Sequence, residues 1–273
     1  RVVSATNGRQ FRIRLTRECL NRCLVHMVFR RGNPALNPQY FAPGMTTERM
    51  TLNGTINKTL FLLSLLAITG SLAYSITSES PGLGGLMLIG GAIGGFIMAL
   101  IIMFVRPANP QVLITMYALL QGLFIGAFSY VIENNYLGGS EGVVFQALIG
   151  TAGVFITMLT LYRLKIIQPS EKYILAVVSM AGAIMMVYLL NFIMSFFGAS
   201  VPFLHSSGPI GIGISVVFTA VAALFLIIDF GMIENGVRHG APKNMEWYGA
   251  FGLVMTLIWL YIEMLKLIAK LRD

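Results

Sequence analysis

Two carboxylic acids lie inside or at the end of long apolar stretches of this 273-residue sequence. Asp229 follows the apolar run Leu226-Ile227-Ile228, and Glu263 interrupts another apolar run, Leu260-Tyr261-Ile262-Glu263-Met264. An ionisable side chain in an apolar span is costly, so each one is a functional hypothesis by default. Two carboxyl groups held close together share a proton and titrate as a unit, which makes a pH sensor. When ionised, they offer the oxygen ligands that calcium prefers. We therefore take Asp229 and Glu263 as a candidate pH sensor and as transient calcium ligands.

The alternative is that Asp229 only caps a helix at the membrane interface and that neighbouring side chains satisfy Glu263. Three further residues belong with the pair: Arg106 could compete for its negative charge, and Glu234 and Glu133 are secondary acidic candidates near span ends. In a hairpin of straight helices, Asp229 and Glu263 would be offset by roughly 15 Å. Direct contact between the two acids would therefore need a bent or broken helix.

The elements that position these residues are predicted to be transmembrane helices. Hydrophobic residues make up 56% of the sequence and charged residues 11%, and the mean hydropathy is +0.77. These values are incompatible with a water-soluble globular enzyme, in which about 25% of residues are charged. A spanning helix needs about 20 mostly apolar residues. Seven stretches qualify, and together they predict an all-α membrane protein with helices near 59–77, 83–105, 111–132, 142–162, 173–197, 210–230 and 248–268.

Lysine and arginine in the short loops predict the orientation of the chain. The tail before the first span and the loops after the second, fourth and sixth spans contain them, whereas the other loops contain none. This alternation places the N-terminus in the cytoplasm. Seven crossings then put the C-terminus outside, which conflicts with Lys266, Lys270 and Arg272. Either this cluster is tolerated or the last segment does not simply cross, and we expect seven crossings.

The chain divides into a basic cytoplasmic tail, residues 1–58, and a seven-helix domain, residues 59–273. The tail has ten Lys and Arg against two Glu, and it accounts for essentially all of the formal net charge of +8. We interpret this charge as an orientation signal and expect no nucleic-acid partner. We expect translation to start at Met27, with residues 1–26 as upstream sequence, although an Arg-rich, acid-poor stretch also resembles a transit peptide.

Residue types suited to catalysis are sparse. Neither a nucleophile elbow, a zinc-protease helix nor a phosphate-binding loop is present in the sequence. Intramembrane proteolysis would want a Ser–His pair or two Asp residues within the spans, and only one Asp and no His lie there. Cys19, Cys23 and His26 have only a loose metal-ligand spacing. We therefore expect no enzyme activity and no cofactor.

Several segments resemble the transmembrane Bax inhibitor motif family, in particular its bacterial YccA-like branch. The C-terminal likeness lies in Asp229-Phe230-Gly231-Met232-Ile233-Glu234, in Arg238-His239-Gly240 and in Leu260-Tyr261-Ile262-Glu263. The N-terminal likeness lies in Gly32-Asn33-Pro34-Ala35-Leu36-Asn37 and in Met50-Thr51-Leu52-Asn53-Gly54-Thr55. Together these segments extend the resemblance over about 32–272 of the chain.

The resemblance implies six helices around a central C-terminal helix and a proton-sensitive calcium leak, in a bacterial inner membrane. It also implies that acids on helices six and seven form the sensor and that an arginine ending helix two latches onto it. Asp229, Glu263 and Arg106 fall on these positions. The family usually has Asp on helix seven, where this chain has Glu. The match at Arg106 depends on its position at the end of the second span, before Pro107.

Two other functions are kept open. The chain could be a regulator without transport activity that binds a membrane protease or a stress-response protein through residues 27–58. It could also be a proton-coupled transporter of a small solute, although the internal repeat typical of such transporters is not evident. A channel would need Asp229 and Glu263, whereas a binding regulator would need the tail.

Overall fold

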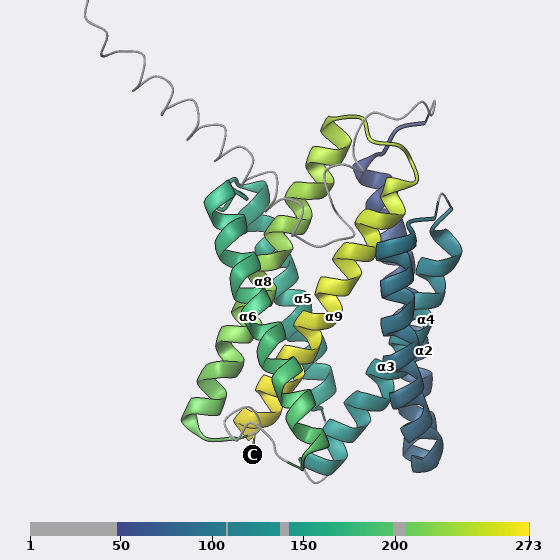
Figure 1. The fold of residues 1–273 in the computed structure, drawn as a ribbon, viewed down its shortest axis with the longest axis vertical. Coiled ribbons are helices and arrows are strands. Elements are labelled where there is room, and N and C mark those ends of the chain that lie inside the picture. The colour runs from purple at the N-terminus through teal and green to yellow at the C-terminus, as the bar shows by residue number, and fades with distance from the viewer. Residues whose placement is uncertain (1–47, 108, 137–141, 199–205, 273) are drawn as a thin grey trace, which may run out of the picture.

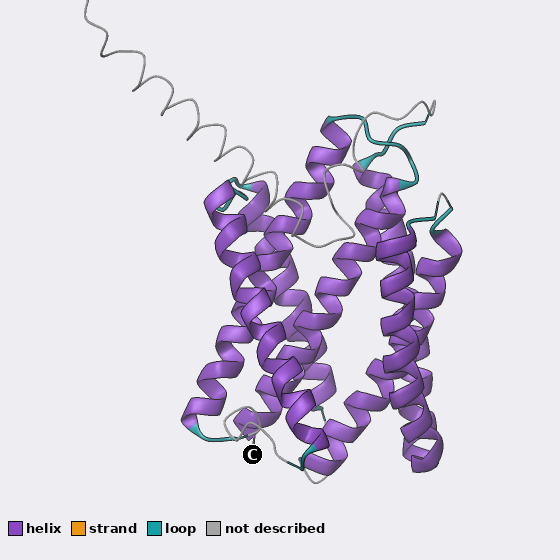
Figure 2. Ribbon diagram, viewed as in Figure 1, coloured by secondary structure: helices purple, strands orange, loops and turns teal. Residues whose placement is uncertain are grey.

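The computed structural model describes residues 48–107, 109–136, 142–198 and 206–272 of the chain. Within these residues it contains helices and loops only (Figure 2). Seven helices are long and apolar enough to cross a membrane, which confirms the predicted all-α membrane fold. They are α2 (Leu52–Glu79), α3 (Pro81–Val105), α4 (Gln111–Val131), α5 (Val143–Arg163), α6 (Glu171–Phe196), α8 (Pro209–Arg238) and α9 (Met245–Arg272), and the π-helix η3 (Ile132–Tyr136) continues α4.

Local sequence explains where several of these helices begin and end. The Thr51 hydroxyl accepts a hydrogen bond from the Gly54 N–H at 3.0 Å and caps α2, so this helix begins seven residues before the predicted apolar span. Pro81 and Pro209 occupy the first positions of α3 and α8, where a missing N–H costs nothing. Helices therefore extend past their apolar segments, because the capping residue and not the hydropathy of the segment fixes where a helix begins.

The C-terminal helix α9 runs through the middle of the bundle (Figure 1). In its most apolar segment 61% of the residues are buried, compared with at most 44% in any other helix. Helices α2, α4, α5 and α8 pack directly against α9, whereas α3 packs on α2 and α4, and α6 packs on α8. The expected ring of six helices around the seventh is thus only partly formed: four helices line α9 along their lengths and two stand outside them.

Small residues let α2, α3 and α4 approach closely, because a glycine has no side chain to hold two helix backbones apart. A Cβ atom added at Gly91 of α3 would lie 2.7 Å from the Phe124 backbone nitrogen of α4. A Cβ atom at Gly126 of α4 would overlap the Gly70 carbonyl oxygen of α2. Gly90, the neighbour of Gly91, has open space around it. Backbone-to-backbone contact therefore holds these three helices together.

Helix α9 separates the interior into two hydrophobic clusters. The first joins α9 to α2 and α4, and Phe251 packs there against Tyr117 with their ring centroids 4.8 Å apart. The second joins α9 to α8 and α6 through residues such as Leu226, Ile227 and Leu260. Helix α9 therefore contributes side chains to both clusters.

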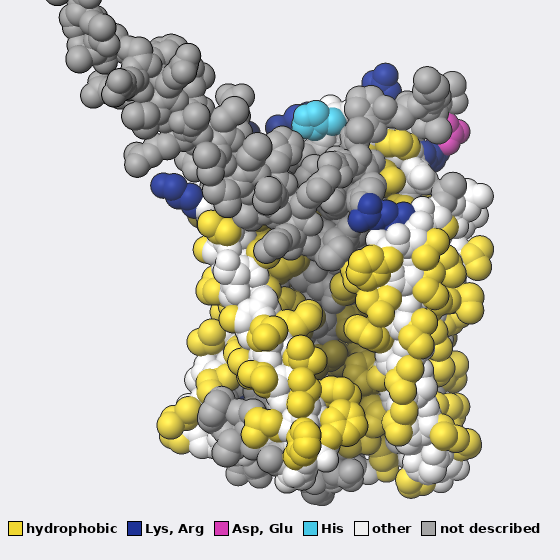
Figure 3. Space-filling view, in the orientation of Figure 1, with side chains coloured by type: hydrophobic (Ala, Val, Ile, Leu, Met, Phe, Trp, Pro, Cys, Tyr) yellow, Lys and Arg dark blue, Asp and Glu magenta, His cyan; other side chains and the backbone are white. Residues whose placement is uncertain are grey.

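Charged residues gather at one end of the bundle, where α2 begins and α8 ends. On the face shown in Figure 3, hydrophobic side chains cover the flank, and Lys, Arg and His side chains lie at the upper end. Large apolar side chains such as Leu86, Phe104 and Phe145 are mostly exposed on the outside of the helices. Such a surface is stable against lipid and not against water, so this chain is an integral membrane protein.

Candidate functional site

Asp229 lies on α8 and is completely buried against α9. The hydroxyl of Thr256 on α9 donates a hydrogen bond to its Oδ2 at 2.5 Å. That hydroxyl also lies 3.2 Å from the Gly252 carbonyl oxygen of its own helix, so the shorter contact with Asp229 is the stronger of the two. A buried segment of α8 around this position presents the carboxyl group to the central helix rather than to lipid.

Glu263 lies on α9 and is 1% exposed. The Tyr188 hydroxyl of α6 and the Lys266 ammonium group each donate a hydrogen bond to its Oε1 at 2.8 Å. Lys266 also lies 2.5 Å from the Tyr188 hydroxyl and 4.5 Å from the centre of the Tyr188 ring. Glu263 is therefore an ion-paired carboxylate, held by a cation from its own helix and a phenol from α6.

The two acids share one helix interface but stand at different heights. Thr256, the partner of Asp229, precedes Glu263 by seven residues of α9, which is about 10 Å along the helix axis. Helix α8 is unbroken through Asp229, so the two acids are not brought together by a break in this helix. The sharing of one proton between Asp229 and Glu263 stays a prediction, and in this conformation each acid has its own hydrogen-bond donors.

Two of the three C-terminal cations that conflicted with an outward C-terminus have partners inside the bundle, whereas Arg272 is exposed. Lys266 pairs with Glu263, and Lys270 donates hydrogen bonds to Ser215 Oγ at 2.9 Å and to the Gly211 carbonyl oxygen at 3.2 Å. Because they have polar partners inside the bundle, these lysines do not need to reach water at that end. The spacing of Glu263, Lys266 and Lys270 on one helical face is the signal that could have revealed this arrangement.

Arg106 ends α3 in a left-handed backbone conformation, with φ 52°. It is exposed, and its Nε donates a hydrogen bond to the Met103 carbonyl oxygen at 2.9 Å. The neighbouring Pro107 carbonyl oxygen accepts a bond from Tyr248 of α9 at 2.9 Å, which ties this corner to the start of the central helix. A latch onto the buried Asp229 would need the Arg106 side chain to turn inward, and it stays a prediction.

The two secondary acidic candidates, Glu133 and Glu234, bond with different residues from those that hold Asp229 and Glu263. Glu133 in η3 accepts hydrogen bonds from the Gly142 and Val143 N–H groups at 2.8 and 3.2 Å, so it caps the start of α5. Its other oxygen accepts a bond from the Tyr74 hydroxyl at 2.8 Å. Glu234 on α8 bonds with the Tyr162 hydroxyl and forms an ion pair with Arg238 at 2.8 Å. Glu133 thus organises a helix start, and Glu234 lies at the rim of a cavity.

Sequence reasoning missed one buried acid, Glu246, in the first turn of α9. It is 1% exposed, accepts hydrogen bonds from the Thr51 N–H and hydroxyl at 2.9 Å each, and forms an ion pair with Lys58. An acid near a helix start commonly interacts only with its own helix N-terminus. No local signal shows that Glu246 instead joins the beginning of α9 to the beginning of α2.

Among the residues that the structure describes, no three His, Cys, Asp or Glu side chains gather to form a metal site. Cys19, Cys23 and His26 lie outside the described residues. Calcium was expected at Asp229 and Glu263 only as a passing ion, and that expectation enters the proposal below. A cavity of about 800 Å³ also opens between α2, α5 and α8, with Leu253 of α9 at its inner side.

Comparison with known protein families gives one match. A family model described as Bax inhibitor 1 like matches residues 24–273, which include every described helix and the acids Asp229, Glu263, Glu234 and Glu133 as well as Arg106. Among curated proteins, none matches this sequence significantly.

Proposed function

Because the chain belongs to the Bax inhibitor 1 like family, we propose that this multi-pass membrane protein lets calcium leak across its membrane under the control of two buried acids. The observation that carries the proposal is the position of Asp229 and Glu263. Both are at most 1% exposed, and both lie on the packed interface of the central helix α9. Ionisable residues in the interior of a membrane bundle are rare, and ion pathways and proton relays are among the functions they mark.

The two acids form successive steps along the axis of the bundle. Asp229 lies nine residues before the end of α8, and Glu263 lies nine residues before the end of α9 at the opposite end of the molecule. A calcium ion needs several oxygen ligands. Beside the acids, the hydroxyls of Thr256 and Tyr188 add neutral oxygens to the carboxylates. We propose that the ion passes from one carboxylate to the other.

The acids can influence each other without touching. Two like charges about 10 Å apart interact by about 1.5 kcal/mol at an effective dielectric constant near 20. An interaction of this size couples two titrations. In the proposal, protonation changes the hydrogen bonds of both acids, and the α8–α9 interface then shifts between two arrangements. Arg106 competes for Asp229 in one of them.

The conformation described here represents the non-conducting arrangement in this proposal. Lys266 neutralises Glu263, so calcium can bind Glu263 only after the ion pair has opened. The end of the bundle where α2 begins faces the cytoplasm, because the basic loops gather there. A bacterial inner membrane is the proposed location, and neither a catalytic role nor a cofactor forms part of the proposal.

The test is calcium entry into proteoliposomes between pH 6 and 8. The purified protein is compared with Asp229→Asn, Glu263→Gln and the control Glu171→Gln, which removes an exposed acid from the first turn of α6. We expect the wild type and the control to leak calcium with the same pH dependence and each buried-acid variant to flatten it. A wild type that passes no calcium at any pH would contradict the proposal and favour a regulator that binds a membrane protease or stress-response protein through its tail.

A further inference from the structure

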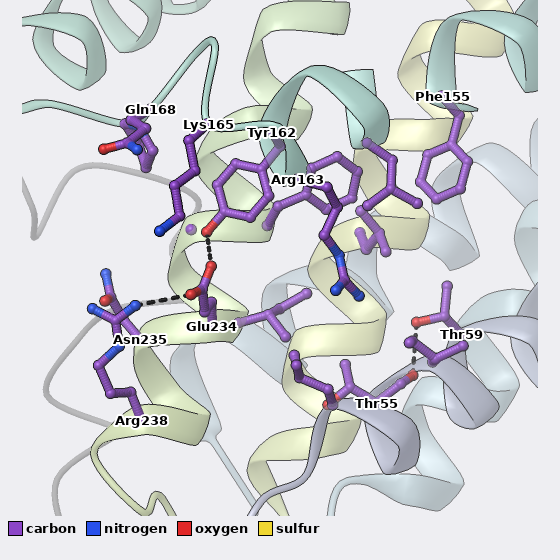
Figure 4. A pocket seen from close by; sticks show the side chains of 18 of the residues that line it. Thr55, Thr59, Phe155, Tyr162, Arg163, Lys165, Gln168, Glu234, Asn235 and Arg238 are labelled. Atoms are coloured by element: carbon purple, nitrogen blue, oxygen red, sulfur yellow. Dashed lines mark hydrogen bonds and ion pairs between the residues drawn. The ribbon is translucent and has the colours of Figure 1, made fainter. Parts of the chain in front are cut away.

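The cavity between α2, α5 and α8 lies at the charged end of the bundle and has a polar rim and an apolar wall. Its volume of about 800 Å³ falls within the roughly 300–1,000 Å³ of small-molecule sites. Figure 4 shows Arg163 and Lys165 extending from the end of α5 on either side of the Tyr162 ring, with Thr55 and Thr59 of α2 on the far side. The hydroxyls of both threonines donate to carbonyl oxygens of their own helix. The α2 side of the cavity therefore has little free hydrogen-bonding capacity.

The apolar wall continues to the outer surface of the bundle. Ile56 and Leu60 of α2 line the cavity and are 46% and 57% exposed, so they face both the cavity and the surroundings of the protein. Leu159 and Phe155 of α5 form the opposite wall. In the described part of the chain, α2 and α5 do not pack extensively against each other. The cavity thus reaches the outer apolar surface of the bundle beside Ile56 and Leu60.

The rim carries an excess of positive charge. Arg238 is paired with Glu234, which also accepts the Tyr162 hydroxyl. Arg163 and Lys165 are exposed, and within the described residues neither forms an ion pair. Lys165 has a left-handed backbone, φ 57°, at a position after a helix that glycine usually fills. Two cations are therefore available for an anion that comes from the cavity mouth.

We propose that this cavity binds an anionic phospholipid of the surrounding leaflet. The phosphate group lies against Arg163, because a guanidinium group binds two phosphate oxygens at once, and the Lys165 ammonium group adds a point charge to the rim. One acyl chain follows the apolar wall formed by Ile56, Leu60 and Leu159 toward the middle of the membrane. Basic pockets between transmembrane helices on the cytoplasmic side are known to take such headgroups.

Charge complementarity separates this occupant from the other candidate, the N-terminal tail of the chain itself. Residues 1–47 contain eight Arg and one Glu, so the tail would bring positive charge to a positive rim. A phospholipid brings the opposite charge, together with a chain that suits the apolar wall. The inference is independent of calcium conduction, because it depends only on the residues of the cavity.

The test is a titration of the full-length protein in neutral detergent with dimyristoyl phosphatidylglycerol, followed by native mass spectrometry, with dimyristoyl phosphatidylcholine in parallel. We expect the protein to retain phosphatidylglycerol in preference to phosphatidylcholine. The double variant Arg163→Gln, Lys165→Gln should bind phosphatidylglycerol about tenfold more weakly or worse, since each cation near the headgroup contributes to the attraction. The control Lys172→Gln removes an exposed cation at the same end of the bundle but outside the cavity, and it should bind like the wild type.

Two further variants test the charged rim and the apolar wall separately. The conservative double variant Arg163→Lys, Lys165→Arg should retain the preference, and Ile56→Trp, which fills the apolar wall, should weaken binding with the rim intact. Equal retention of both lipids by the wild type would overturn the proposal, as would an equal loss of binding in Lys172→Gln. Competition by millimolar inorganic phosphate would also overturn it, because the site would then recognise a free anion rather than a lipid.

Discussion

The two flanks of the central helix are held together in different ways. On one flank, α2, α3 and α4 meet backbone to backbone at glycines such as Gly91 and Gly126. On the other flank, α6 and α8 contact α9 through side chains that can gain or lose a proton, Asp229 and Glu263 with their partners. Contacts between backbones do not respond to pH, whereas carboxyl groups do. The glycine contacts among α2, α3 and α4 are therefore indifferent to protonation, whereas carboxyl groups lie on both flanks: Asp229 and Glu263 on the α6–α8 side, and Glu133 and Glu246 beside α2.

The largest effect is expected from the glycine flank. Gly126→Leu would force a side chain into the backbone of α2 and should lower the free energy of unfolding by about 3 kcal/mol. The folded fraction of this variant should keep the wild-type pH dependence of calcium flux, since the substitution changes no titrating group. Unfolding in SDS measures the change in the free energy of unfolding, and calcium flux into proteoliposomes measures the pH dependence. Gly90→Ala is the matched control and should behave like the wild type, because open space surrounds Gly90.

On the carboxyl flank, Glu263→Gln should cost about 2 kcal/mol of stability, because it leaves the Lys266 ammonium group without its carboxylate. The paired variant Glu263→Gln, Lys266→Met removes both charges and should recover much of this loss. SDS unfolding of the single and double variants checks the prediction. If the double variant is as unstable as the two single changes added together, the ion pair does not hold α9 in the way described.

A smaller effect is expected at Thr256, the hydroxyl donor to Asp229. Thr256→Val keeps the shape of the side chain, removes one buried hydrogen bond and should cost about 1 kcal/mol. The pH profile of the flux should change, because the Asp229 carboxyl group loses its hydroxyl partner on α9. Thr157→Val is a suitable control, since the Thr157 hydroxyl bonds only its own helix on the outside of α5. An unchanged pH profile in Thr256→Val would separate this threonine from the sensor.

The smallest effect is expected outside the membrane-spanning helices, at the exposed ion pair of Glu48 and Lys243. The hydrogen bond from Lys243 to the Glu48 carboxylate raises the pKa of Lys243. A raised lysine pKa adds stability that is present below about pH 10.4 and is lost as the pH rises through the folded-state value. Both groups are solvent-exposed, so Glu48→Gln should leave unfolding at pH 7 unchanged. A clear loss of stability would mean that this pair anchors the start of α2.

Apolar stretches were sufficient to predict the seven helices. In a membrane the backbone must form its hydrogen bonds internally, and a helix does so within a single segment. Asp229 and Glu263 were recognisable because an acid stands out in an apolar span. Their partners were not predictable: Thr256 and Tyr188 are ordinary residues whose contacts depend on how α8 and α6 are aligned with α9. The central position of α9 and the role of Glu246 also depend on packing between distant segments, which the sequence pattern of a single helix does not determine.

The most direct test of the central claim is a double-variant cycle on the pH dependence of calcium flux. Asp229→Asn, Glu263→Gln and the combination of both are compared with the wild type in proteoliposomes from pH 6 to 8. If the two acids act as one coupled sensor, either single change flattens the profile and the combined change flattens it no further. If the two effects simply add, or if the combined variant keeps the wild-type profile, then the buried acids do not control the flux together and the account is wrong.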